Sequence, residues 1–131
     1  MKGKVFILDF DVVAVEAHEQ YLYEDGWEVY SESVDNRLAF DKIKADQPDV
    51  VVIYLSAMTA YGRALADDLR ANRETAGIPI IFVDGKDKAV KKAQEEIANA
   101  IFTTQEDVLG ELLRFVRREP GEKADIQELD H

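Results

Sequence analysis

The chain has 131 residues, 47% of them hydrophobic and 33% charged, which is typical of one globular domain with its own core. Its formal net charge of −11 argues against direct binding to nucleic acid or to an anionic membrane, because phosphate contacts need clusters of Lys and Arg. The absence of cysteine excludes disulfides and thiolate metal sites, and no apolar run approaches the roughly 20 residues of a membrane span. With no signal peptide in the sequence, we expect a cytoplasmic protein.

Five short apolar segments predict β-strands. The clearest is Val50–Tyr54, which follows Pro48-Asp49 and begins with four consecutive β-branched residues. A strand without polar interruption is typical of the interior of a parallel sheet, where helices cover both faces. The other four strands are expected at Lys4–Asp9, Trp27–Tyr30, Ile78–Val83 and Ala100–Phe102.

Between these strands, apolar residues recur at helical spacing and predict five helices. The first helix is expected to bury Ala14, Ala17, His18, Tyr21 and Leu22, and to end at Asp25-Gly26 because glycine commonly caps a helix. The next three are expected over 36–47, 62–73 and 88–98. The last is expected from Val108 to Arg117, with Leu109, Leu112, Leu113 and Val116 facing inward.

Regular alternation of strands and helices predicts an α/β fold with a doubly wound, five-stranded parallel sheet of the flavodoxin-like kind. The first, third and fourth strands are the most apolar and should be interior, and the second should be an edge, which gives the order 2-1-3-4-5. We expect one domain over residues 1–118, followed by an acidic, flexible tail over residues 119–131.

Several short motifs follow one another along the chain in a recognisable order. They are Asp9-Phe10-Asp11, Glu24-Asp25-Gly26-Trp27, Asp35-Asn36, Pro48-Asp49 and the run from Leu69 to Ile81. In this order and spacing, the sequence resembles the receiver domain of two-component response regulators over nearly its whole length. The resemblance implies a signalling function, with the family's chemistry at the carboxyl ends of the strands.

In that family, a phosphoryl group is transferred to an Asp that ends the third strand. Two acids after the first strand hold Mg²⁺, a Thr or Ser ends the fourth strand, and a Lys precedes a Pro after the fifth. The resemblance places other residues at these positions: Tyr54 at the phosphoacceptor, Phe10 at the direct metal ligand, Asp84 at the Thr or Ser, Thr104 at the Lys, Gln105 at the Pro, and Ile101 at an aromatic that switches. The chain therefore resembles an atypical receiver, a pseudo-receiver, without aspartyl phosphorylation, cofactor or enzymatic activity.

Tyr54 and the three aspartates of this degenerate pocket each allow two interpretations. Tyr54 is read as a plug that fills the place of metal and phosphate, with its hydroxyl near Asp9 or Asp84; the alternative is a ligand-contacting or phosphorylatable tyrosine. Asp9, Asp11 and Asp84 are read as remnants that are solvated or cap helices, and the alternative is a weak Mg²⁺ or Ca²⁺ site. His18 is read as a partly buried structural residue, because one His cannot make a metal site.

The one dense basic cluster is Lys86, Lys88, Lys91 and Lys92, read either as a solvated helix face or as part of a partner surface. The favoured function is a protein-interaction module of a signalling pathway, with Lys88, Lys91 and Lys92 at the rim of its surface and Ile101 near the centre. The same face, from the fourth helix to the fifth, would also permit a homodimer. The alternative is a small-molecule or nucleotide sensor at the carboxyl ends of the strands, although Asp9–Val13 lacks the glycines of a phosphate loop.

Overall fold

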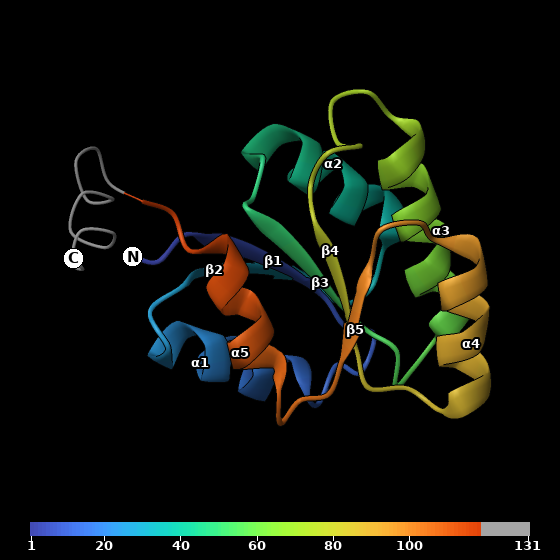
Figure 1. Ribbon diagram of the computed structural model, residues 1–131, viewed down its shortest axis with the longest axis horizontal. Coiled ribbons are helices and arrows are strands. Elements are labelled where there is room, and N and C mark those ends of the chain that lie inside the picture. The colour runs from blue at the N-terminus through green and yellow to red at the C-terminus, as the bar shows by residue number, and fades with distance from the viewer. Residues whose placement is uncertain (119–131) are drawn as a thin grey trace, which may run out of the picture.

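The structure, a computed structural model, describes residues 1–118, which form a five-stranded parallel sheet between two layers of helices (Figure 1). The strand order is β2-β1-β3-β4-β5, as predicted. The strands are β1 (Lys4–Leu8), β2 (Glu28–Glu32), β3 (Val50–Tyr54), β4 (Ile80–Val83) and β5 (Ile101–Thr103). All five residues of β3 are buried, and β2 pairs with β1 alone, which confirms β3 as interior and β2 as an edge. The predicted acidic tail lies outside the described residues.

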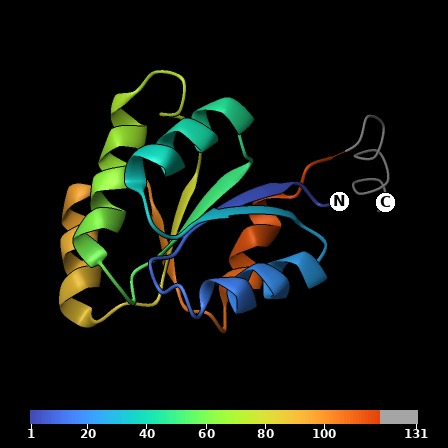
Figure 2. The same cartoon turned by 180° about the vertical axis from the view of Figure 1, so that it is seen from behind.

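Three helices cover one face of the sheet and two cover the other, as Figures 1 and 2 show from opposite sides. The first layer holds α2 (Asn36–Asp46), α3 (Thr59–Ala71) and α4 (Asp87–Glu96), and the second holds α1 (Val15–Glu24) and α5 (Val108–Leu112), which continues into the 3₁₀ helix Leu113–Phe115. None of the helices in residues 1–118 has the length and apolar composition needed to cross a membrane.

Alternation along β3 divides its side chains between the two layers. Val51 and Ile53 pack with α2, α3 and α4, whereas Val50, Val52 and Tyr54 pack with α1 and α5. Because successive side chains of a strand point to opposite faces, Tyr54 is directed into the α1–α5 layer at the carboxyl end of the strand.

Local sequence explains both ends of α2 and the close packing of α3 on β3. The side chain of Asp35 caps α2 by accepting from the backbone amides of Arg37 and Leu38, at 2.8 and 3.1 Å. α2 ends at Asp46, and the next residue, Gln47, is left-handed with φ 48° and precedes Pro48. On α3, a Cβ at Gly62 would lie 2.9 Å from Cγ2 of Ile53, so glycine allows α3 to pack closely on β3.

Three expectations about the helices are wrong. α3 begins at Thr59, ahead of Gly62. α5 ends at Leu112, not Arg117, and its 3₁₀ continuation turns Phe115 and Val116 toward the core while Leu113 stays 63% exposed. On α1, Ala17 and Tyr21 are exposed, whereas His18 is partly buried and Leu22, four residues further on, is fully buried.

Candidate functional site

Tyr54 forms the centre of a closed cluster at the carboxyl end of β3. Its side chain is buried, as predicted, with 2% of the residue exposed. The phenol ring stacks face to face on the imidazole of His18, with ring centroids 4.0 Å apart and planes 4° from parallel. Its hydroxyl donates to Oε1 of Gln105 at 2.7 Å. The ring and the hydroxyl are therefore both held in place, as expected of a side chain that fills a site.

Asp9 supports this cluster from the end of β1. The residue is completely buried, and its Oδ2 lies 2.5 Å from Nδ1 of His18. Because a carboxylate accepts but does not donate, Nδ1 of His18 is the donor in this bond. The other carboxylate oxygen accepts from the backbone amide of Asp11 at 3.0 Å. Both oxygens of Asp9 are thus used within the protein.

Asp84 connects to the same cluster through Gln105. Its Oδ1 accepts from the backbone amide of Gln105 at 3.0 Å, while the Gln105 side chain meets Tyr54. The expected hydroxyl partner, Asp9 or Asp84, is therefore replaced by a residue that Asp84 positions. Burial, together with the negative charges of Asp9 and Asp84, raises the pKa of Tyr54 well above its ordinary value, so the phenol stays neutral.

The other three predicted pocket residues are turned elsewhere. Phe10 packs in the opposite layer, edge-on to Tyr61 with ring centroids 5.5 Å apart. The Asp11 side chain closes the turn before α1 by accepting from the amides of Val13 and Ala14, both at 3.1 Å. Thr104 is exposed, and its hydroxyl accepts from the amide of Asp107 at 3.3 Å. Within residues 1–118, no three His, Asp or Glu side chains converge to hold a metal ion.

Sequence reasoning missed the roles of two cluster members. His18 is partly buried as expected, with 18% of its side chain exposed, but its stacking on Tyr54 and its bond to Asp9 were not anticipated. Its spacing of four residues from both Ala14 and Leu22 was the available signal. Gln105 was named only at the family's Pro position, and because it lies in a connecting segment with no periodicity, no sequence signal indicated its bond to Tyr54.

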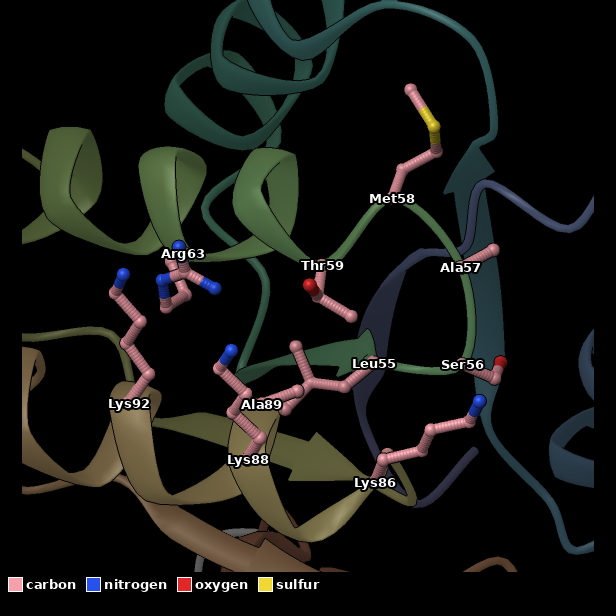
Figure 3. Close-up of a pocket in the computed structure, with 11 residues that line it drawn as sticks. Leu55, Ser56, Ala57, Met58, Thr59, Arg63, Lys86, Lys88, Ala89 and Lys92 are labelled. Carbon is pink, nitrogen blue, oxygen red and sulfur yellow. The ribbon is translucent and has the colours of Figure 1, made fainter.

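Three of the four lysines of the basic cluster line a hollow of about 610 Å³ between the amino-terminal ends of α3 and α4 (Figure 3). In Figure 3, the side chains of Lys88 and Lys92 extend toward Arg63 on α3, and that of Lys86 extends toward Ser56. Lys91 does not line this hollow. Ile101 is half-buried and lines a separate hollow with Phe115. The residues proposed for one interaction surface are thus not gathered in one depression.

Solved structures similar to this fold include receiver domains of two-component signalling proteins. The chemotaxis protein CheY4 of Vibrio cholerae matches with a TM-score of 0.73 and 18% identity, over 88% of this chain and 100% of that one. The signal receiver domain of a histidine kinase from Syntrophus aciditrophicus gives 0.71 and 20%, over 89% and 95%. The chain has the receiver-domain fold.

A further receiver domain, from a sensor histidine kinase of Pseudomonas aeruginosa, matches with a TM-score of 0.68 and 15% identity, over 88% of this chain and 98% of that one. That structure holds a magnesium ion in its active-site cleft. The sequence matches no protein-family model and no curated protein.

Two different arrangements share the carboxyl edge of the sheet in this receiver fold. On the α1–α5 side, Tyr54, His18, Asp9 and Gln105 form a closed set of contacts. On the other side, the hollow between α3 and α4 is open and positively charged. The first arrangement is suited to holding the fold in one state, and the second is suited to receiving a ligand.

Proposed function

We propose that this chain is a pseudo-receiver, a protein-interaction module of a two-component signalling pathway that acts without aspartyl phosphorylation. The observation that carries the proposal is the buried Tyr54 at the carboxyl end of β3, stacked on His18 and bonded to Gln105. By the family resemblance, this is the position of the carboxylate that accepts the phosphoryl group. A neutral, buried phenol is a poor nucleophile, so Tyr54 does not replace that carboxylate.

The residues around Tyr54 also differ from those that bind the metal ion and the phosphoryl group in the family. Both carboxylate oxygens of Asp9 are engaged within the protein, by His18 and by the amide of Asp11, and Oδ1 of Asp11 is engaged by the turn before α1. At the position that the resemblance assigns to Lys, Thr104 is exposed and carries no charge. The Asp9–His18 pair has no nucleophile to activate, because the Tyr54 hydroxyl donates to Gln105. We therefore also propose that the chain is not an enzyme.

Incubation with acetyl phosphate and Mg²⁺, followed by intact-mass measurement, tests the proposal. We expect no phosphoryl adduct on the parent chain. The Tyr54→Asp variant should not react either, because it still lacks the Lys and one metal ligand. A stoichiometric adduct on the parent that hydroxylamine removes would show that aspartyl phosphorylation occurs after all.

Partner binding is proposed for the face formed by α4, β5 and α5. Lys91 is exposed on α4 outside the hollow that Lys88 and Lys92 line, and Ile101 on β5 is half-buried with few rotamers, which favours one fixed arrangement. Charge reversal at Lys91 should weaken capture of a protein partner or self-association in solution, and the effect should shrink at high salt. Unchanged binding in Lys91→Glu, together with loss of binding in Tyr54→Ala, would place the interface at the carboxyl ends of the strands instead.

A second candidate function, a sensor of a small molecule or nucleotide, is favoured by one observation. The hollow between α3 and α4 lies at the carboxyl ends of β3 and β4 and is lined by Arg63, Lys86, Lys88 and Lys92. Ligands of open parallel sheets bind at this edge.

A further inference from the structure

We infer that the hollow between α3 and α4 binds a small organic molecule that carries a phosphate group. This inference names a ligand class for the second candidate function, and it is independent of whether the chain is phosphorylated. The hollow measures about 610 Å³, within the range of roughly 300–1,000 Å³ common for small-molecule sites.

The charge of the hollow opposes the charge of the chain. Arg63, Lys86, Lys88 and Lys92 bring four positive charges into one depression of a chain whose formal net charge is −11. Within residues 1–118, none of these three lysines forms an ion pair. Clefts lined by one sign of charge concentrate ions of the opposite sign, so this hollow attracts anions.

Arg63 is only partly satisfied by its acidic neighbour. Its Nε lies 3.3 Å from Oε1 of Glu96, yet the same buried Nε makes no hydrogen bond, because the two groups are close but poorly aligned. The Arg63 side chain is 14% exposed, so little water reaches it. A phosphate oxygen in the hollow would give the Arg63 guanidinium the aligned acceptor that Glu96 does not provide.

The backbone adds donors at the same place. α3 and α4 both begin at the hollow, and neither has a side-chain cap on its first turn. Uncapped amides and the positive end of a helix both favour an anion. The hydroxyls of Ser56 and Thr59 also line the hollow, and Figure 3 shows that of Thr59 between the two helices. Ammonium, hydroxyl and amide groups together form a set of donors suited to phosphate oxygens.

The β3–α3 loop is held in an unfavourable conformation where it lines the hollow. Met58 is left-handed with φ 50°, a region that residues other than glycine rarely adopt. Across the hollow, Gly85 has φ 102° and directly follows Asp84, which has φ 61°. Backbone strain of this kind collects at ligand sites, where the surrounding structure maintains it.

The remaining lining residues indicate that the ligand has a carbon body. Leu55, Ala57, Met58 and Ala89 form an apolar wall, and Met58 is 52% exposed. Inorganic phosphate would leave this wall in contact with water, whereas an organic phosphate would cover it. The hollow therefore suits a phosphate joined to an apolar or aromatic group.

Phenyl phosphate is a probe with both features, and its binding to the full chain can be followed by backbone amide NMR shifts. We expect saturable shifts in residues 56–63 and 85–92 with a Kd of about 1 mM, as suits so small a ligand. Inorganic phosphate, without the ring, and phenol, without the phosphate, should each bind at least about tenfold more weakly.

Two variants on one helix form the matched pair. Lys88→Glu and Lys91→Glu change the net charge equally, but only Lys88 lines the hollow. Lys88→Glu should weaken phenyl phosphate binding by about tenfold or more, and Lys91→Glu by less than about twofold. Equal effects of the two variants, or no saturable shift at these residues, would overturn the inference. So would tighter binding of a hexaglutamate peptide than of phenyl phosphate at the same residues, which would indicate docking of an acidic protein segment.

Discussion

At the scale of single residues, Tyr54 joins α1 to the segment after β5 at the carboxyl end of β3. Its ring covers His18, and its hydroxyl reaches Gln105 in the segment between β5 and α5. The same ring lies in the core cluster with Val52, so it contributes packing as well as a hydrogen bond. These two contributions can be separated by substitution.

Tyr54→Phe should keep the packing and lose only the hydrogen bond, at a cost of about 0.5–1.5 kcal/mol in the free energy of unfolding. Tyr54→Ala also leaves a cavity, so its cost should be about 3–5 kcal/mol. Urea unfolding measures both values. Tyr61→Phe is a suitable control, because Tyr61 is 49% exposed and should tolerate the change. A Tyr54→Ala chain as stable as the parent would contradict the role of Tyr54 as a plug.

Glu32, at the end of β2, makes stability depend on pH. Burial opposes its ionised form, but hydrogen bonds from Lys42 and from the amides of Asp35 and Val34 outweigh this, so the pKa of Glu32 falls below its ordinary value of 4.5. A lowered pKa in the folded state adds stability that is present above the unfolded pKa and is lost as pH falls through the folded one.

Glu32→Gln should therefore destabilise the chain by about 1–3 kcal/mol at neutral pH. The difference from the parent should shrink as the pH falls through the lowered pKa of Glu32, where the parent carboxylate also becomes protonated. Unfolding by urea at neutral and acidic pH measures the difference. Glu95→Gln changes an exposed carboxylate and should have little effect at either pH. A difference that does not change with pH would disprove the proposed linkage.

At the scale of elements, Arg70 joins two connections on the amino side of the sheet. From α3, its guanidinium donates to the carbonyls of Ile78 and Ala76 before β4, at 2.9 and 3.3 Å. It also donates to the carbonyls of Ala98 and Asn99 after α4, at 3.2 and 3.3 Å. Partial burial lowers the pKa of Arg70, yet a guanidinium remains charged at neutral pH.

Replacement of Arg70 by Lys should cost about 1–3 kcal/mol in the free energy of unfolding, because an ammonium group cannot reach all four carbonyls. Hydrogen exchange should quicken at residues 98–100, where the connection to β5 loses its support. Arg37→Lys provides the control, since the Arg37 side chain is 86% exposed and its nearest acid is 3.8 Å away. Equal stability of the Arg70→Lys and parent chains would show that these hydrogen bonds contribute little.

The elements were predictable to different degrees. β3 was clear from Val50–Ile53, because a strand covered on both faces needs an uninterrupted apolar sequence. The end of α5 was not, because Leu113 and Phe115 exchange inward and outward positions when the last turn tightens from an α-helix to a 3₁₀ helix.

At the site, side chains at the ends of strands were predictable, whereas side chains in the connecting segments were not. Asp9, Tyr54 and Asp84 could be placed together, since Tyr54 ends β3 and the two aspartates directly follow β1 and β4 at the same edge of the sheet. Gln105 could not, because its position depends on the path of the chain after β5. Conversely, Thr104 was expected in the pocket but lies exposed, one residue away from the side chain that enters it.

At the scale of the whole molecule, the last described residues close the domain against its first strand. The backbone amide of Arg117 donates to the carbonyl of Lys2 at 2.6 Å, and its guanidinium lies 2.6 Å from Oδ2 of Asp49. The same Asp49 oxygen accepts from the amide of Lys4 at 2.7 Å. Arg117 thus joins the two ends of the domain through a carboxylate that precedes β3.

Arg117→Ala should lower the free energy of unfolding by about 1–2 kcal/mol, because it removes the charged partner of Asp49 from a half-exposed pair. A chain that ends at Arg118 should unfold at the same urea concentration as the full chain, since the residues of both core clusters precede Arg117. A large loss of stability on removal of residues 119–131 would contradict the assignment of residues 1–118 as the domain.

The contact between Lys2 and Arg117 also determines how this domain could be joined to another protein or to a surface. Both ends of the described chain leave from the amino edge of the sheet, while the hollow between α3 and α4 opens at the carboxyl edge, about 17 Å away along strands of five residues. The domain could therefore be inserted into a surface loop of a host protein, or attached to a sensor chip by either end, with its cationic hollow left open to solution. Joining residue 118 to residue 1 through a short linker would likewise permit new ends to be cut elsewhere, as in a circularly permuted reporter.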